Sequence, residues 1–413
     1  MKVLLICSVL QDGIGQYFGK NEQYLGGWIE GIVKGLANYP DITLSYVVFE
    51  QGNHDDLQMH SVRGIDYYVV TFKSTAPIHE FFSKNQYDIY HLFGAEHSYI
   101  KYICRELPME RTLVYIQGLI SEYYWHFYAN YNQYFKSYNP FFKGYLKISA
   151  EIFRKNGLVE QEIIRNAKYI TGRTDWDRAV LYKADCKAIY YPLNETLRSE
   201  FYSAGKWKPD HMKRHTIFVS QTNYPIKCAH MIVEMLRILK PHYSDLECLI
   251  AGYDLMKTTS LTSRLGISYA CYIRKLIRDC HLEDTIHFIG NQPASEMIHR
   301  LQESNVFLLA SSVENSPNSL QEAMEIGTPC VSSYVGGVST LVGDSGGCLL
   351  YPYDDPAQGA YMISRIFEDD NLAEALSEKA VNRIDRLIDR ERNARTLHEI
   401  YCDMGWRIRS TQK

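Results

Sequence analysis

The sequence predicts two α/β domains, each built on a doubly wound parallel sheet. Its 413 residues exceed what one hydrophobic core usually holds, so two domains of about 200 residues are expected. Short apolar runs alternate with helical stretches along the chain, which is typical of parallel sheets covered by helices on both faces. One complete strand, loop, helix and second strand lie within residues 304–337, and this stretch is the most informative part of the sequence.

The composition limits the partners and the compartment. The formal net charge is −4, so there is no electrostatic argument for nucleic acid. The ten cysteines are scattered and form no Cys-x-x-Cys pair, which favours reduced thiols in a cytoplasmic enzyme over disulfides or a zinc site. The apolar segment Val3–Leu10 is too short to span a membrane and lacks a signal-peptide cleavage pattern, so we expect it to be the first β-strand.

The first half of the chain carries the strands of one predicted sheet. After the first strand, the glycines at 13, 15 and 19 suggest a dinucleotide fingerprint, but no clean helix opens on them and we assign none. Gly26 and Gly27 precede the amphipathic helix Trp28–Leu36, where they either let the backbone approach a ligand closely or form a flexible turn. Further strand-like runs are found at Thr43–Phe49, Asp66–Thr71, Asp88–Leu92 and Leu113–Ile116.

Polar side chains lie at the ends of two of these strands. His91 closes one strand and His97 follows it, and Gln117 with Gly118 follows the next. Ligands of open α/β sheets bind at the carboxyl ends of the strands, so these residues are candidates for contact with a substrate. A single histidine is more often structural than functional, and that alternative stays open for both histidines.

An aromatic stretch interrupts the pattern. Residues 123–145 hold twelve aromatic side chains among twenty-three residues, with lysines between them. Aromatic rings mixed with lysines suit a bilayer interface, where an apolar body and a polar tip are both satisfied. A tyrosine-rich lid that packs on its own domain is the alternative. Trp125, Phe141 and Phe142 are the candidates for acceptor or membrane contact, which would place the protein at the inner face of the cytoplasmic membrane.

Asp175 and Asp177 form the Asp-x-Asp pattern that holds a metal ion in some sugar-transferring enzymes. The flanking strand expected for such a site is missing, and acidic residues also favour the start of a helix, where they interact with the helix dipole. We therefore predict that a helix begins here and assign no metal site.

The second half of the chain starts a new sheet. Lys227 lies where a loop turns into a helix, and Asn291 with Gln292 follows a strand that ends in glycine. Exposed lysines are common, so position alone gives Lys227 no role. The expected strands are Thr216–Gln221, Leu246–Gly252 and Thr285–Gly290, and the expected final helices are Asp355–Phe367, Asn371–Ile388 and Glu391–Tyr401.

Two carboxylates distinguish the unit at residues 304–337. Val306–Ala310 reads as a buried parallel strand, and Glu314 lies in the loop after it. The next helix carries Glu322 and stops before the glycine and proline at 327–329. Buried carboxylates accept hydrogen bonds from vicinal sugar hydroxyls, whereas two glutamates near a helix start can also be ordinary solvated residues.

The helix start is the predicted phosphate site of this unit. Ser316 is expected at the N-cap with Pro317 at the first helical position, and Asn318 with Gln321 offers a capping box one register later. Free amides at a helix N-terminus bind anions, so a phosphate is expected near the amides of residues 316–320.

Glu314 and Glu322, followed by Ala-Met-x-x-Gly-x-Pro, a strand and Gly336-Gly337, resemble the signature of the family-four retaining glycosyltransferases of GT-B fold. The resemblance spans nearly the whole chain and is strongest over Gln221–Lys227 and Ser304–Val342. It implies two Rossmann-like domains that face a central cleft, and a nucleoside-diphosphate sugar as donor. A UDP-sugar is expected before a GDP-sugar, and no cofactor or metal is required.

The resemblance also implies domain boundaries. Ile189–Phe201 is similar to the linker of the family, so residues 1–195 would form the acceptor-binding domain and residues 210–390 the donor-binding domain. In this fold the last helix, here about residues 391–413, usually returns to the first domain.

The family pattern assigns roles to individual residues and shows two departures. Glu322 would bind the ribose, Glu314 the donor sugar, and Lys227 the departing diphosphate. Gln117 stands where the family commonly has a histidine and Gln221 where it usually has an arginine, which puts an acid–base role and one diphosphate cation in doubt. The implied catalytic residues are Glu314, Lys227 and Gln117. The implied donor-binding residues are Gly26, Gly27, Gln221, Lys227, Asn291, Gln292, Glu314, Asn315, Ser316, Asn318, Ser319, Leu320 and Glu322.

The predicted function is metal-independent sugar transfer with retention of the anomeric configuration. The acceptor implied by family habit and the aromatic stretch is a saccharide or a lipid-linked saccharide of a surface polysaccharide. Two alternatives stay open, namely a nucleotide-sugar epimerase of the same fold and a donor-binding subunit without catalysis. Gln117 counts against the epimerase, and the replaced family cations motivate the inactive subunit.

Overall fold

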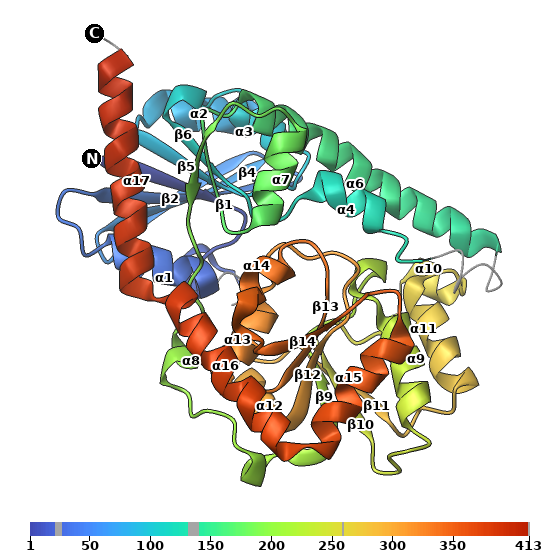
Figure 1. Ribbon diagram of the computed structural model, residues 1–413. Coiled ribbons are helices and arrows are strands. Elements are labelled where there is room, and N and C mark those ends of the chain that lie inside the picture. The colour runs from blue at the N-terminus through green and yellow to red at the C-terminus, as the bar shows by residue number, and fades with distance from the viewer. Residues whose placement is uncertain (21–26, 131–139, 258–259, 412–413) are drawn as a thin grey trace. The chain divides into compact units, whose positions relative to one another are not determined.

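The computed structural model describes residues 1–20, 27–130, 140–257 and 260–411. Its contacts divide the chain into two compact units (Figure 1). Unit 1 comprises Met1–Ser121, Lys155–Ser199 and Leu387–Lys413, and unit 2 comprises Glu122–Arg154 and Glu200–Arg386.

Unit 1 is built on an eight-stranded sheet in the order β3-β4-β2-β1-β5-β6-β7-β8. All neighbours pair in parallel except β3 and β4, which form an antiparallel hairpin at one edge. The strands are β1 (Lys2–Cys7), β2 (Thr43–Gln51), β3 (Asp56–Val62), β4 (Ile65–Phe72), β5 (Ile89–Phe93), β6 (Thr112–Tyr115), β7 (Tyr169–Gly172) and β8 (Ile189–Pro192).

Helices cover both faces of this sheet because its central strands are apolar on both faces. In β1, Val3 and Leu5 join one hydrophobic layer while Leu4 and Ile6 join the other. The first layer is completed by α1 (Gly27–Leu36) and α17 (Arg390–Thr411). The second is completed by α2 (Ala76–Lys84), α3 (Ile100–Cys104), α7 (Asp175–Lys183) and the end of α6 (Pro140–Asn166). Short 3-10 turns are η1 (Gly15–Phe18) and η2 (Met109–Arg111).

Unit 2 is built on a six-stranded sheet in the order β11-β10-β9-β12-β13-β14, with every pair parallel. The strands are β9 (Lys213–Val219), β10 (Glu247–Ala251), β11 (Ile286–Gly290), β12 (Ser304–Leu309), β13 (Cys330–Ser333) and β14 (Cys348–Tyr351). The helices are α4 (Ile120–His126), α8 (Ser199–Ser203), α9 (Ala229–Leu239), α10 (Leu261–Arg264), α11 (Tyr269–Asp279), α12 (Ala294–Glu303), α13 (Asn318–Ile326), α14 (Val338–Val342), α15 (Pro356–Glu368) and α16 (Asp370–Ile388). Short 3-10 turns are η3 (Pro209–His211), η4 (Pro225–Lys227) and η5 (Gly343–Ser345).

Two doubly wound parallel sheets confirm the predicted fold class. The long apolar strands were predicted, whereas β3, β7, β8 and β14 were not. β3 is a largely exposed edge strand, and β7, β8 and β14 have only four residues each, so none of them shows a strong period-two or apolar signal.

The segment Glu122–Arg154 groups with unit 2, although the sequence placed it inside a domain of residues 1–195. Side-chain contacts within unit 2 explain this grouping. The ring of Phe142 stacks on Tyr272 at 5.8 Å. The buried imidazole of His230 on α9 hydrogen-bonds the Ala129 carbonyl oxygen and the Tyr269 hydroxyl, each at 3.0 Å.

The stretch Ile189–Phe201, predicted to be a linker, is more structured than expected. Its first four residues form β8, the edge strand of unit 1, and the division between the units falls after Ser199. The Glu195 side chain in this stretch is buried and ion-paired with Arg173.

The C-terminal helix α17 packs on α1 within unit 1 (Figure 1). Gly35 of α1 allows the close approach, because a Cβ there would lie 2.5 Å from the Cβ of Ala394. Across the described part of the chain, none of the helices combines the length and the apolar composition needed to cross a bilayer.

Candidate functional site

The loop after β9 places Lys227 at the carboxyl edge of the unit 2 sheet. η4 carries Lys227 at its end, and Cys228 then adopts the left-handed conformation at φ 54° before α9 begins. The turn is closed by hydrogen bonds from the amides of Lys227 and Cys228, to the carbonyl oxygens of Tyr224 and Pro225 respectively, each at 2.9 Å. The Lys227 ammonium lies 5.9 Å from the centroid of the Tyr224 ring, so backbone and side chain are both held.

Glu314 lies in the loop after β12 and forms an ion pair with Lys227. The Glu314 Oε1 atom lies 2.5 Å from the Lys227 Nζ and accepts a hydrogen bond of 2.6 Å from the Ser311 hydroxyl. The Gly337 amide donates to the Glu314 carbonyl oxygen at 3.0 Å, which joins this loop to the turn after β13. The side chains of Lys227 and Glu314 are only 11% and 8% exposed, and a pair this buried is much less screened than one on the surface.

The charge of Lys227 is stabilised in spite of its burial. Burial acts to lower the pKa of Lys227, but the Glu314 carboxylate and the Tyr224 side chain outweigh it and raise that pKa above its usual value. Lys227 is therefore a fixed cation at the sheet edge, already in place for an anionic ligand.

The start of α13 differs from the prediction by one residue. The helix begins at Asn318 with Pro317 at the N-cap, so neither Ser316 nor Asn318 caps it in the predicted way. The Gln321 side-chain amide instead donates to the Asn318 Oδ1 at 3.2 Å, which replaces the expected capping box. Proline has no side-chain acceptor, and no side chain caps this helix.

An uncapped helix start leaves amide donors for a ligand. The first turn of a helix has N–H groups without intrahelical acceptors, and its end of the dipole attracts negative charge. The first turn of α13 carries no acidic side chain, so nothing in that turn competes with an external anion. Ser316, Asn318 and Ser319 are partly exposed here, while Asn315, Leu320 and Glu322 are buried.

The remaining predicted donor residues of unit 2 lie at the same edge, because the carboxyl ends of parallel strands share one edge of a sheet. Gln221 is exposed after β9, and Asn291 is exposed after β11. The side-chain amide of Gln292 donates to the Ile289 carbonyl oxygen at 2.5 Å and so holds the loop after β11. Of the unit 1 pair, Gly27 opens α1, and Gly26 lies outside the described residues.

Unit 1 has a hollow of its own at the carboxyl ends of β1 and β5. Gly94, Glu96, His97 and Gln117 are among the residues that line it. The glycine at 94 is required there, because its φ is +83° and a Cβ would lie 3.0 Å from the Gln117 Oε1. Sequence reasoning identified Gln117 and His97 but missed Glu96.

The surroundings of this hollow shift the pKa values of Glu96 and His97. Burial raises the pKa of Glu96, and the Gly118 amide and the Arg173 guanidinium offset only part of that effect. Burial also lowers the pKa of His97, whose ring stacks on Tyr99 at 5.3 Å. A polar residue directly after the predicted strand Asp88–Leu92 was the available signal for Glu96.

Two predicted contact residues, His91 and Phe142, have other roles. His91 is fully buried in β5, where its Nδ1 lies 2.7 Å from the Tyr401 hydroxyl, which makes it a core residue rather than a contact for an acceptor. Phe142 is likewise fully buried. Asp177 caps α7 with Thr174 in a capping box, as the helix-start interpretation predicted. Trp125 and Phe141 remain exposed, at 70% and 73%.

Comparison with known proteins places the second half of the chain in a family. Residues 203–383 match the family model described as glycosyl transferases group 1. The N-acetyl-alpha-D-glucosaminyl L-malate synthase of Bacillus anthracis is 29% identical over 136 residues, which are 32% of this chain and 35% of that protein. The amylovoran biosynthesis glycosyltransferase AmsK of Erwinia amylovora is 30% identical over 140 residues, 32% of this chain and 31% of that protein. The chain thus spans about a third of the length of these curated relatives.

Solved structures match over nearly the whole chain. Sucrose-phosphate synthase from Thermosynechococcus elongatus superposes with a TM-score of 0.71 at 17% identity, covering 98% of both chains. Anabaena Alr3699/HepE in complex with UDP superposes with a TM-score of 0.67 at 14% identity, covering 98% of this chain and 100% of that one. At these identities the likeness concerns the fold alone. The chain has the GT-B fold, and residues 203–383 resemble the glycosyl transferases group 1 family.

Proposed function

We propose that this protein transfers a sugar from a nucleoside-diphosphate sugar to a saccharide or lipid-linked acceptor. The observation that carries the proposal is the buried Lys227–Glu314 ion pair at the strand ends of unit 2, in the same unit as the uncapped start of α13. The match of residues 203–383 to a glycosyltransferase family supports it independently.

The donor's diphosphate is the part that this site fits best. Lys227 supplies a fixed positive charge, and the first-turn amides of α13 supply oriented N–H donors. Glu322, buried in the second turn of α13, is proposed to accept hydrogen bonds from the ribose hydroxyls, and Glu314 from the sugar. When the diphosphate binds, Lys227 exchanges part of its contact with Glu314 for contact with phosphate oxygens.

The proposed reaction retains the anomeric configuration and requires no metal ion. The bond between the anomeric carbon and the diphosphate oxygen breaks, and the acceptor oxygen forms a bond to that carbon on the same face. The acceptor's hydroxyl proton passes to the departing phosphate oxygen, so atoms and charge balance. Lys227 and the α13 amides stabilise the negative charge that develops on the diphosphate as the bond breaks.

The donor base proposed first is uracil, and the acceptor belongs to a surface polysaccharide. The HepE structure contains UDP, and one curated relative is named for amylovoran biosynthesis. For the acceptor we propose the hollow of unit 1 with Glu96, His97 and Gln117. The exposed Trp125 and Phe141 suit contact with a membrane surface that presents a lipid-linked acceptor.

The proposal is tested by following turnover without an acceptor, since retaining transferases hydrolyse their donor slowly. UDP-, GDP-, ADP- and TDP-sugars are incubated with the protein in EDTA, and NMR records the released nucleotide and the anomer of the released sugar. We expect release from one nucleotide class, UDP first, with the anomeric configuration of the donor. Glu314→Gln, which keeps the size of the side chain but removes its charge and replaces one acceptor oxygen with an amide donor, should reduce the rate about 100-fold.

Three outcomes would contradict the proposal. Release of the inverted anomer would exclude retention, and an absolute need for a divalent ion would exclude the metal-independent mechanism. Conversion of the donor sugar to its epimer without release of nucleotide would establish the epimerase alternative instead.

A further inference from the structure

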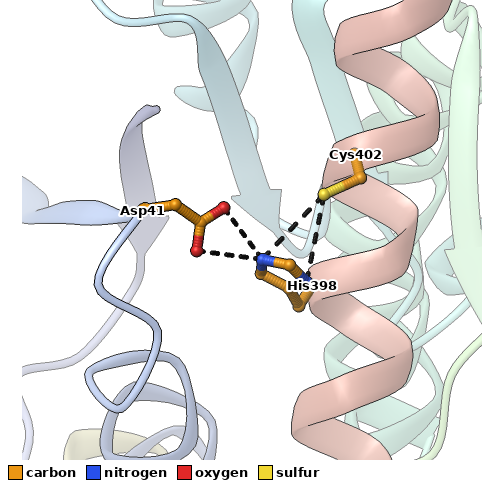
Figure 2. A group of neighbouring side chains, drawn as sticks. All are labelled: Asp41, His398 and Cys402. Atoms are coloured by element: carbon orange, nitrogen blue, oxygen red, sulfur yellow. Dashed lines mark hydrogen bonds and ion pairs between the residues drawn. The ribbon is translucent and has the colours of Figure 1, made fainter.

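Three metal-binding side chains converge within unit 1, away from the residues assigned to the reaction. Asp41 lies in the loop between α1 and β2, and His398 and Cys402 lie one turn apart on α17 (Figure 2). One ligand atom from each, namely a carboxylate oxygen, an imidazole nitrogen and a thiol sulfur, lies within 4.8 Å of the others. From the geometry we infer that Asp41, His398 and Cys402 form a binding site for a zinc-class divalent cation.

The distances are those of a site ready to close on an ion. Ligands at about 2.0–2.3 Å around one tetrahedral zinc ion lie about 3.4–3.6 Å from each other. The His398 Nε2 lies 3.1 and 3.0 Å from the two Asp41 carboxylate oxygens, and the Cys402 Sγ lies 3.9 Å from each ring nitrogen of His398. These distances differ from those around zinc by a few tenths of an ångström, and all three ligand atoms lie within 4.8 Å of one another, so side-chain rotations can bring them to one centre.

The backbone and the neighbouring ring hold the ligands in place. A spacing of four residues puts His398 and Cys402 on the same face of α17. Tyr39, two residues before Asp41, stacks on the His398 ring at 4.1 Å with an angle of 14° between the planes. The buried contact of α17 with α1 fixes the helix that carries two ligands, while the loop supplies the third.

The donor set selects the class of ion. One imidazole, one thiolate and one carboxylate match the borderline-soft preference of zinc, whereas calcium and magnesium take oxygen ligands. The fourth position faces solvent, because Asp41 and Cys402 are exposed, so water completes the coordination.

This site would clamp the C-terminal helix to unit 1 without taking part in sugar transfer. None of its three residues belongs to the proposed donor or acceptor sites. The inference is thus independent of the proposed function, and a metal requirement for turnover is not expected from it.

The test uses cobalt(II) as a spectroscopic probe and zinc(II) in calorimetry, on the full chain. We expect one equivalent of cobalt with thiolate-to-metal charge-transfer absorption, displaced by zinc. Cys402→Ser should abolish that absorption and weaken zinc binding at least tenfold, and Asp41→Asn should weaken zinc binding about tenfold. Zinc should also raise the melting temperature of the wild type but not of Cys402→Ser.

Two matched controls make the test decisive. Cys280→Ser removes another partly exposed thiol, and His215→Ala breaks a second surface histidine–aspartate pair whose Nδ1 to Oδ1 distance is 2.7 Å. Neither should change cobalt absorption or zinc affinity. An unaltered spectrum in Cys402→Ser, loss of binding in Cys280→Ser, or no zinc binding by the wild type would each overturn the inference. UDP binding measured on the same variants reports separately on the donor site.

Discussion

The strand ends of the two units carry charge in different ways. In unit 2, Lys227 and Glu314 pair at the sheet edge, and Glu314 also accepts a hydrogen bond from the Ser311 hydroxyl. In unit 1, the Arg173 guanidinium pairs with the buried Glu195 and donates to the Gln117 carbonyl oxygen at 3.0 Å, while its amide donates to the Asp177 carboxylate at 2.7 Å. The charges of unit 1 thus hold three segments together, whereas the cation of unit 2 is placed to meet a ligand.

A buried ion pair at a strand end can therefore serve either to hold segments together or to bind a ligand. Both pairs involve side chains that are almost inaccessible, at 5% and 2% for Arg173 and Glu195 and at 11% and 8% for Lys227 and Glu314. The second lies in the same unit as the uncapped start of α13, where an anion would find further donors. Substitutions of the Arg173–Glu195 pair should therefore change stability, and those of the Lys227–Glu314 pair should change binding and turnover.

The largest expected effect is on the stability of unit 1. Arg173→Met removes the cation that faces the buried Glu195 carboxylate, which should reduce the free energy of unfolding by about 3–5 kcal/mol. Urea unfolding followed by hydrogen exchange in β7 and β8 measures it. The double variant Arg173→Met with Glu195→Leu should recover most of the loss, since no unpaired charge remains.

A surface pair provides the matched control for this prediction. Lys187 and Asp185 are 81% and 84% exposed, so Asp185→Asn should change stability by less than about 1 kcal/mol. If Arg173→Met lowers the free energy of unfolding no more than Asp185→Asn does, the Arg173–Glu195 pair does not have the structural role inferred for it.

The next effect is on turnover by unit 2. Lys227→Met should lower kcat for donor hydrolysis about 100-fold, because the developing negative charge on the diphosphate loses its fixed cation. Circular dichroism and the melting temperature check that the variant remains folded with Glu314 unpaired. A Lys227→Met protein that is folded and turns over at the wild-type rate would remove Lys227 from the mechanism.

A smaller effect is expected for Gln117 in the hollow of unit 1. An uncharged amide contributes a hydrogen bond of roughly 1 kcal/mol, so Gln117→Ala should lower kcat with acceptor by about tenfold or less. Nucleotide affinity, measured in parallel, should not change. A 1,000-fold loss of kcat would contradict this prediction, because it would require Gln117 to take part in the chemistry. An amide cannot do so as an acid or a base.

The most gradual effect is the response to acid. Burial lowers the pKa of His230 in unit 2 to about 4 and that of His91 in unit 1 to about 3. Both folded-state values lie below the unfolded value of about 6.5, so each imidazole contributes stability above that pH which is lost as the pH falls towards the folded value. Each should weaken the protein by roughly 1 kcal/mol per pH unit within its window.

The two histidines can be separated by substitution. His230→Gln should flatten the pH dependence of hydrogen exchange in β9 and β10, and His91→Gln should do so in β1 and β5. Slopes that persist in both variants would assign the acid sensitivity to other groups.

The sequence predicted the parts of the fold that depend on local pattern. The two sheets, the strand Val306–Ala310 and the stop of α13 at Gly327 follow from apolar runs and turn residues, and the structure has them. The position of Lys227 at a loop-to-helix turn was also predicted. The contact of Lys227 with Glu314, which lies 87 positions later, was not predicted. Such pairing depends on the order of strands β9 and β12 in the sheet.

Other features were predicted wrongly or missed because the same residue type fits two structural roles. His91 was a candidate because it ends a strand, but it lies inside the core, where its Nδ1 pairs with the Tyr401 hydroxyl 310 positions away. Phe142 and Phe141 are adjacent and equally aromatic, yet one is fully buried and the other is 73% exposed, since a helix turns them to different faces. Glu96 was missed because its environment comes from Gly118 and Arg173, which the sequence does not place next to it.

The central claim, that the nucleotide of the donor binds at the strand ends of unit 2, is tested most directly by calorimetric titration of UDP. Wild type, Glu322→Ala and Gln117→Ala are compared, with GDP as the competing nucleotide. The account predicts one equivalent of UDP, at least tenfold weaker binding in Glu322→Ala and unchanged binding in Gln117→Ala. Unchanged binding in Glu322→Ala together with a loss in Gln117→Ala would contradict it, and so would a wild-type protein that binds neither nucleotide.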